Sequence, residues 1–378
     1  MSVPPPDGWQ PPQQPGPPPN QGQPYGQAGY YSQQPPPGWQ QGNWPQSGPS
    51  PKNGNSLKWL LIGVAVLLVV GISVGATLIF TRDTNSGSTT PHSGTTGDFA
   101  SADDMGPVSI ITDEPTCKTF LSVNNSLGDV QRNGWSDARG TLGPAAEWTA
   151  EQRSQTQAVA SSMRIASDQI APLAKQTPHR VVRELYEQFI AYGRAYADSI
   201  ANYVPRDDNL ASANINISAT LFGICESIEN GSANRTISVT PPAPPTSATN
   251  PRNTLQAEPF ITSFEGPCAA WSTSADKFNA NTSEWQKLDP NNPSQWSPEQ
   301  RAQQKAAMPF VSTWAQDMEA VGRQSKNPVF EDFATTAAVY LQGYVSAGDS
   351  YVGADGWLRY VAYKINQTVL SACNAVAG

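Results

Sequence analysis

The residues best suited to chemistry in this chain are its two histidines and four cysteines. His92 lies in a Ser/Thr/Gly-rich stretch, and we expect His179 at the first turn of a helix, as a solvated surface residue. Two histidines are too few for a His-rich metal site, and the sequence contains neither a Gly-rich phosphate loop nor a nucleophile elbow. We therefore expect a protein that is not an enzyme and that holds no metal or cofactor.

The cysteines occupy equivalent positions in an internal repeat. At an offset of 148 residues the chain aligns with itself, and the aligned pairs include Trp148 with Trp296, Arg153 with Arg301, Tyr192 with Tyr340, Tyr196 with Tyr344 and Cys225 with Cys373. Cys117 aligns with Cys268 at an offset of 151 residues. Two copies of one domain therefore stand in tandem, joined by a Pro/Thr/Asn-rich linker.

Each copy has the pattern of four amphipathic helices. Apolar residues recur at spacings of three and four, as in the stripe Val159, Met163, Ala166, Ile170 and Leu173. Thr149 with Gln152, and Ser297 with Gln300, have the spacing of capping boxes that start a helix. The sequence thus predicts an all-α protein with two tandem four-helix bundles.

The bundle arrangement also predicts how the cysteines pair. In an up-down-up-down bundle the start of the first helix and the end of the fourth lie at the same end. Cys117 and Cys225 occupy these two positions in the first copy, and Cys268 and Cys373 occupy them in the second. We expect a disulfide in each copy, because the alternative of a zinc site would need closer Cys-x-x-Cys spacing.

Two features are candidates for binding. Trp148 with Arg153, and Trp296 with Arg301, could form an exposed site with a cation–π contact, or could serve only as a helix cap and packing group. The many aromatic residues of the second copy could line a groove for a lipid, glycan or peptide. The alternative is that the tyrosine stripes belong to the core.

A continuous apolar run without charge spans residues 59–80, which is long enough to cross a bilayer. Lys52 and Lys58 precede it, so the positive-inside rule places the N-terminus in the cytoplasm and the cysteines in an oxidising compartment. Gly71 and Gly75 form a Gly-x-x-x-Gly pair that could support a homodimer. The expected domains are a disordered Pro/Gln/Gly-rich tail (1–56), a transmembrane helix (57–81), a Ser/Thr/Gly linker (82–106), the first repeat (107–230), a Pro-rich linker (231–258) and the second repeat (259–378).

This layout resembles the proline-rich single-pass membrane proteins of mycobacteria and related actinobacteria. The resemblance is carried by the Pro/Gln/Gly/Tyr-rich tail, the apolar run, the stretch NSGSTTPHSGTTG and the cysteine-stapled outer domain. It implies a plasma-membrane protein with an extracytoplasmic domain. A reader of Pro-rich motifs is the expected cytoplasmic partner of the tail.

The function expected from these features is that of a scaffold, adaptor or signal-transmitting protein in the cell envelope, with a protein partner there. The alternative is an extracytoplasmic module that binds a lipid, glycan or peptide. A nucleic-acid partner is not expected, because the chain has a net charge of −8 and contains no cluster of Lys or Arg.

Overall fold

The computed structural model describes residues 99–235, 239–249, 254–264, 266–290 and 292–377. The tail, the transmembrane helix and most of the first linker predicted above lie outside these residues. Within the described residues, no helix combines the length and the apolar character of a membrane span. This part of the chain is helical and contains no strand, as predicted.

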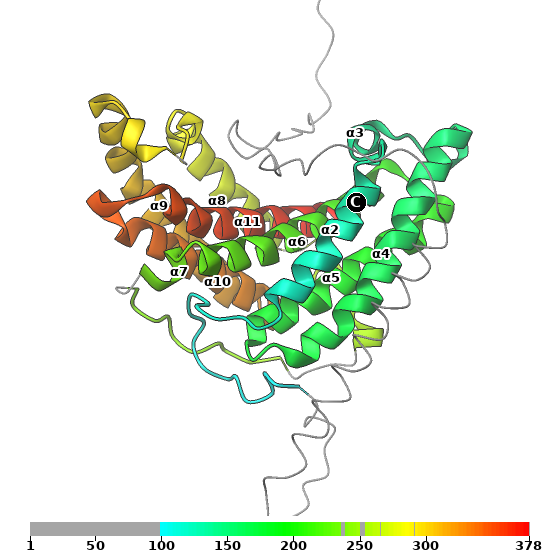
Figure 1. The fold of residues 1–378 in the computed structure, drawn as a ribbon, viewed down its shortest axis with the longest axis horizontal. Helices are drawn as coiled ribbons and strands as arrows, with labels where there is room; N and C mark the ends of the chain where they lie inside the picture. Colours follow the sequence, from blue (N-terminus) through cyan, green and yellow to red (C-terminus); the bar gives the residue numbers. More distant parts are fainter. Residues whose placement is uncertain (1–98, 236–238, 250–253, 265, 291, 378) are drawn as a thin grey trace, which may run out of the picture.

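Four long helices form the first bundle (Figure 1). They pack in a closed arrangement in which α4 contacts α5, α5 contacts α6, and α2 contacts both α4 and α6. Their bounds, with those of the two short helices, are α2 (Cys117–Gln131), α3 (Trp135–Ala138), α4 (Ala150–Gln176), α5 (Arg180–Ser199), α6 (Asp208–Glu229) and α7 (Ser232–Arg235). The predicted apolar stripe of α4 is buried at every position.

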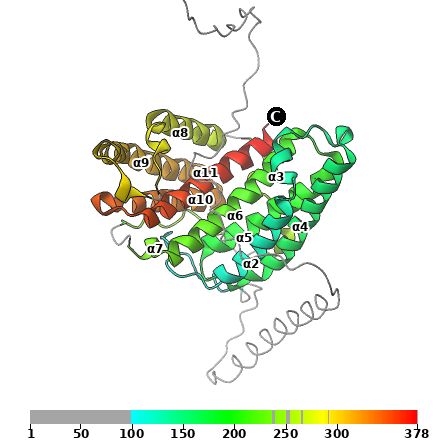
Figure 2. The ribbon, with the colours of Figure 1, turned by 45° about the horizontal axis from the view of Figure 1, so that its top comes forward.

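The second bundle repeats this arrangement (Figure 2). Its helices are α8 (Gly266–Thr282), α9 (Pro298–Gln324), α10 (Pro328–Ser346) and α11 (Gly356–Val376). The helices α9, α10 and α11 begin 148 residues after α4, α5 and α6. Both predicted capping boxes are present, with Thr149 and Ser297 as the N-cap residues of α4 and α9. The predicted helical bundle is therefore confirmed.

Short 3-10 helices connect the long ones. They are η2 (Arg139–Thr141), η3 (Ala145–Glu147), η4 (Ile200–Asn202), η5 (Pro205–Asp207), η6 (Thr254–Gln256), η7 (Trp285–Lys287), η8 (Pro293–Gln295), η9 (Gly348–Ser350) and η10 (Gly353–Asp355).

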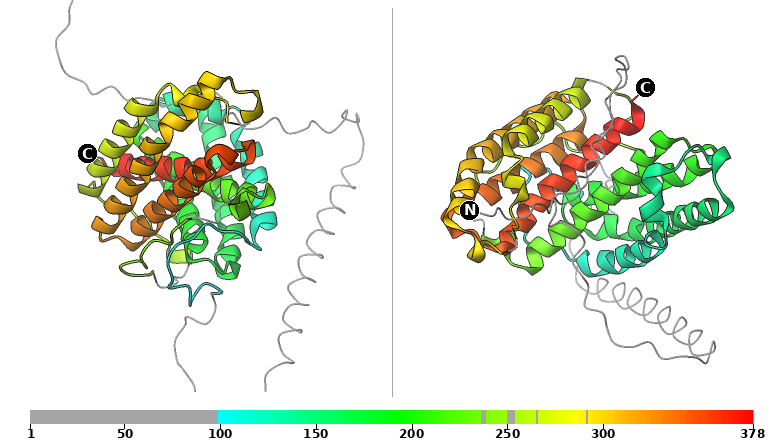
Figure 3. Two further views of the ribbon diagram at one scale, coloured as in Figure 1. Left: turned by 90° about the vertical axis from the view of Figure 1, so that its left-hand side faces the viewer. Right: turned by 90° about the horizontal axis from the view of Figure 1, so that it is seen from above.

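The two bundles share a seam formed mainly by α6 and α11, which pack along much of their length (Figure 3). The two helices are antiparallel: Arg206, just before α6, donates to the carbonyl of Ala377 at 2.8 Å, and Arg235, in α7, pairs with Asp355 at 3.1 Å. Gly223 of α6 allows this approach, since a Cβ atom there would lie 2.7 Å from the ring of Tyr360. The bundles therefore pack as one body.

Each bundle is closed by a disulfide, as predicted. Cys117 bonds to Cys225, and Cys268 bonds to Cys373. Each bond joins the start of the first long helix of a bundle to the last part of its fourth.

The tyrosine stripes lie in the core. Tyr192, Tyr196, Tyr340 and Tyr344 are all buried, and burial raises the pKa of each phenol above its ordinary value. The hydroxyls of Tyr196, Tyr340 and Tyr344 have hydrogen-bond partners inside the protein: that of Tyr196 accepts from the indole of Trp135 at 3.0 Å. These rings stabilise the bundles and are not available to line a binding groove.

Candidate functional site

The first Trp–Arg pair packs at the start of α4. Trp148 is 7% exposed, and its Nε1 donates to the carbonyl of Gly143 at 2.7 Å. The guanidinium of Arg153 lies 5.8 Å from the centre of the indole and donates to the carbonyl of Ala145 at 2.7 Å. The predicted cation–π contact is thus present, but both side chains are engaged within the protein.

The second pair packs in the same way at the start of α9. The Nε1 of Trp296 donates to the carbonyl of Asp289 at 2.8 Å, and its ring stacks on Tyr351 with 5.5 Å between ring centres. Arg301 donates to the carbonyl of Ser294 at 3.3 Å. The two pairs lie at the starts of α4 and α9, which belong to separate bundles. The structure does not bring them together, and their contacts favour the interpretation as cap and packing groups.

A more promising site lies where residues 99–116, here called the strap, cross the seam. The strap contacts the first bundle through Ala100, whose N–H donates to the carbonyl of Lys175 at 2.9 Å, and through Asp113, whose carbonyl lies 2.7 Å from Nε2 of His179. It contacts the second bundle through Ile111, whose N–H donates to the hydroxyl of Tyr340 at 3.3 Å. The strap therefore holds the two bundles from one side.

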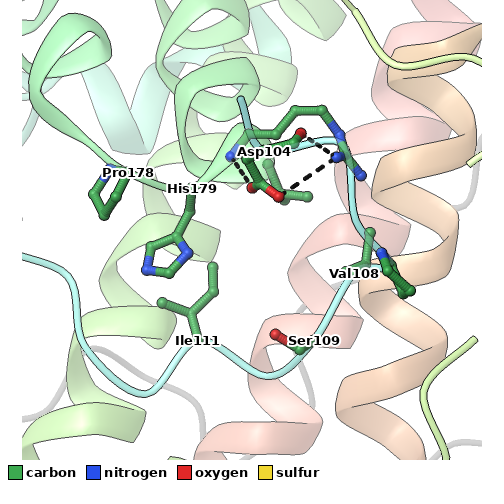
Figure 4. Close-up of a pocket in the computed structure, with 9 residues that line it drawn as sticks. Asp104, Val108, Ser109, Ile111, Pro178 and His179 are labelled. Atoms are coloured by element: carbon green, nitrogen blue, oxygen red, sulfur yellow. Dashed lines mark hydrogen bonds and ion pairs between the residues drawn. The ribbon is translucent and has the colours of Figure 1, made fainter. Parts of the chain in front are cut away.

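Between the strap and the start of α5 lies a pocket of about 280 Å³ (Figure 4). Its labelled lining residues are Asp104, Val108, Ser109, Ile111, Pro178 and His179. The strap passes under the pocket from Val108 to Ile111, while His179 enters from α5. The polar side chains that line the pocket are those of Asp104, Ser109, His179 and Arg180, so the pocket could bind a polar or charged group of a partner.

Asp104 is placed by the first residue of α5. Its carboxylate accepts from the backbone N–H of Arg180 at 2.7 Å. This bond caps the start of α5, where the side chain of the N-cap residue His179 makes no capping bond of its own. The guanidinium of Arg180 in turn donates to the carbonyl of Asp104 at 2.5 Å. A negative side chain at this position also interacts favourably with the helix dipole.

Behind the pocket, Arg180 forms a buried ion pair across the seam with Asp332 of α10. Its Nε and Nη2 donate to the two carboxylate oxygens at 2.7 and 3.1 Å, a bidentate geometry. Both side chains are at most 2% exposed. Although burial opposes the charge of Arg180, the Asp332 carboxylate raises the pKa of the guanidinium above its ordinary value.

A second group of buried charges holds the linker between the repeats. Arg183 of α5 donates to the backbone carbonyl and to the hydroxyl of Thr249, both at 3.0 Å, and the same hydroxyl bonds to Glu184. Glu331 of α10 accepts from the N–H and the hydroxyl of Thr246, both at 3.0 Å. The linker is thus fixed to both bundles by side chains at the starts of α5 and α10.

The described structure contains no cluster of three or more His, Cys, Asp or Glu residues arranged to hold a metal ion. Its pocket and seam instead present charges that are paired or hydrogen-bonded.

Comparison with known proteins identifies the family of the chain. Residues 99–378 match the family described as mycobacterial ESX-1 associated protein. The chain belongs to this family. An uncharacterized protein of Mycolicibacterium smegmatis (strain MKD8) is 38% identical over 341 residues, which cover 88% of this chain and 90% of the relative. No solved structure matches. The family and the relative support the mycobacterial part of the resemblance; they do not show its membrane part.

The charged residues of the seam in this ESX-1 associated protein were not singled out from its sequence. Arg180, Arg183 and Glu184 open α5, where exposed charges are common, so nothing in the local pattern marks them as buried. One signal was available: Asp332 lies between Glu331 and the core residue Phe333 near the start of an otherwise apolar helix. A charge at such a position indicates a buried partner.

The buried carboxyl of Glu184 makes the stability of this family member depend on pH. Burial and the neighbouring Asp332 carboxylate raise the pKa of Glu184 well above its ordinary value. The folded protein therefore binds the proton of the Glu184 carboxyl more tightly than the unfolded chain does. The contribution of this carboxyl to the free energy of unfolding is greatest below its pKa in the unfolded chain, and it is lost as the pH rises through its pKa in the folded protein. We expect the melting temperature of Glu184→Gln, relative to the parent, to increase from about pH 4 to about pH 8. Glu151→Gln, at an exposed position, is the matched control, and a difference that stays constant with pH would contradict the prediction.

Proposed function

We propose that this chain is a non-enzymatic scaffold or adaptor of the mycobacterial cell envelope, acting with components of the ESX-1 system. The family description supports the ESX-1 context. The two disulfides support an oxidising compartment outside the cytoplasm. The proposal rests on one observation. The two disulfide-closed bundles pack along the seam as one body, and a pocket lies open between the strap and the start of α5.

In this proposal the chain is a single-pass plasma-membrane protein. The apolar run of residues 59–80 is its anchor, with the N-terminus in the cytoplasm and the bundles outside. The Pro-rich tail would engage a reader of such motifs, and Gly71 with Gly75 would support pairing of two anchors. The strap precedes all the described helices in the sequence and so follows the anchor most closely. A partner at the pocket would therefore contact the segment next to the anchor in the sequence.

Site-specific crosslinking in mycobacterial cells tests this function. A photoreactive residue replaces Ser109, which lines the pocket and is exposed, while the matched control carries it at Ile165, which is 55% exposed on α4. We expect a crosslink to an ESX-1 component from position 109 that is absent from position 165. Crosslinks of equal yield from both positions, or no crosslink to an ESX-1 component, would count against the proposal.

A further inference from the structure

The two central helices differ on one face although their cores agree. At the offset of 148 residues, several buried positions of α6 and α11 are apolar in both copies, as in Ile217 with Ile365. Four other positions have changed character between the copies: Ala211, Ser212, Ile215 and Asn216 of α6 correspond to Arg359, Tyr360, Tyr363 and Lys364 of α11. The second copy therefore carries two cations and two phenols where the first carries small, aliphatic or amide side chains.

Three of these α11 residues, Arg359, Tyr360 and Tyr363, line an aromatic recess in the second bundle. Phe278 of α8 stacks on Trp314 of α9, with 3.9 Å between ring centres and 9° between ring planes. Together with Trp285 they face Tyr360 and Tyr363, which are only partly buried. The recess has a volume of about 20 Å³, enough for about one water molecule, so it has no room for an acyl chain. It can accept only the end of an apolar side chain.

A cation without a carboxylate partner lies beside the recess. Lys364 makes no ion pair with any described residue, and its ammonium lies 5.4 Å from the ring centre of Tyr360. Partial burial lowers the pKa of Lys364 below its ordinary value.

We propose that Tyr360, Tyr363 and Lys364, with the neighbouring recess, form a docking surface for a protein segment that carries a carboxylate next to an aliphatic side chain. The carboxylate would pair with Lys364, and the terminal methyl group of the aliphatic side chain would enter the recess. Charge complementarity selects an acidic partner, because a carboxylate would form hydrogen bonds to the Lys364 ammonium in place of those to water that partial burial has removed.

The probe that tests this surface is 4-methylpentanoate, with 4-methylpentanamide as its uncharged analogue. Binding to the full-length chain is measured by saturation-transfer NMR. We expect the carboxylate to bind at least about tenfold more tightly than the amide, which corresponds to about 1.4 kcal/mol. Equal binding of the two probes, or no binding of the carboxylate, would overturn the proposal.

Variants of α11 test where the carboxylate probe binds. Tyr363→Ile with Lys364→Asn installs the residues of the first copy and should weaken binding of the carboxylate at least tenfold. Lys364→Met keeps the apolar stem of the side chain and should have the same effect if the charge carries the contact. Lys305→Met, at an exposed position on α9, is the matched control and should change nothing. Binding that survives both variants at Lys364 would also overturn the proposal, and a circular-dichroism spectrum and melting temperature verify that each variant is folded.

Discussion

Replacing Asp332 by alanine is expected to lower the free energy of unfolding by about 3 to 5 kcal/mol. The substitution leaves Arg180 charged and at most 2% exposed, without its bidentate partner. The guanidinium also donates to the strap carbonyls of Asp104 and Gly106, so the start of α5 and the strap should loosen together. Urea unfolding followed by circular dichroism measures the change in free energy.

The control for this prediction removes both charges. Arg180→Met with Asp332→Leu removes both partners of the buried pair and should cost less than Asp332→Ala alone, because a buried ion pair contributes little relative to apolar residues of similar size. Asp208→Ala, which breaks the more exposed pair with Arg139, should also cost less. If Asp332→Ala changed the free energy of unfolding by less than about 1 kcal/mol, the buried pair would not hold the seam.

Removing the first disulfide by Cys117→Ala with Cys225→Ala is expected to cost about 4 to 5 kcal/mol on the chain-entropy model. The bond closes a loop with a sequence separation of 108 residues, so the unfolded chain gains a large amount of freedom when it is absent. Because α6 carries Cys225 and also forms the seam, the second bundle should lose stability together with the first. Calorimetry of the purified chain measures both effects.

The matched variant is Cys268→Ala with Cys373→Ala, whose bond spans 105 residues. We expect nearly the same loss, since the loop lengths are nearly equal. Each variant should unfold in one transition at a lower temperature. Two transitions, one of them unchanged from the parent, would show that the bundles unfold independently and would contradict a cooperative seam.

Features that depend on short stretches of sequence were predictable. Residues three and four apart share a helix face, so the α4 stripe from Val159 to Leu173 identified both a helix and its buried side. Thr149 and Gln152 form a capping box within one turn, which the spacing alone indicates. The disulfides followed from the helix order, because the fold of a bundle places Cys117 and Cys225 at one end.

Features that join distant parts of the chain were not predictable in this way. The pair of Arg180 and Asp332 links helices of different copies, and no local pattern relates the two residues. Residues 99–106 were assigned to a Ser/Thr/Gly linker by composition, yet Asp104 caps α5 from there. The pocket depends on this long-range contact, so neither the pocket nor its lining by His179 could be read from spacing alone.

The two disulfides also determine how the chain responds to a pulling force. A loop closed by a covalent bond cannot lengthen when its helices unravel, because tension passes through the sulfur atoms instead of through the enclosed residues. Most of the chain from Cys117 to Cys373 lies inside the two loops, so only the strap, the linker and the ends can extend. A protein built in this way would stretch little under load while its bonds are oxidised, and would become far more extensible once they are reduced.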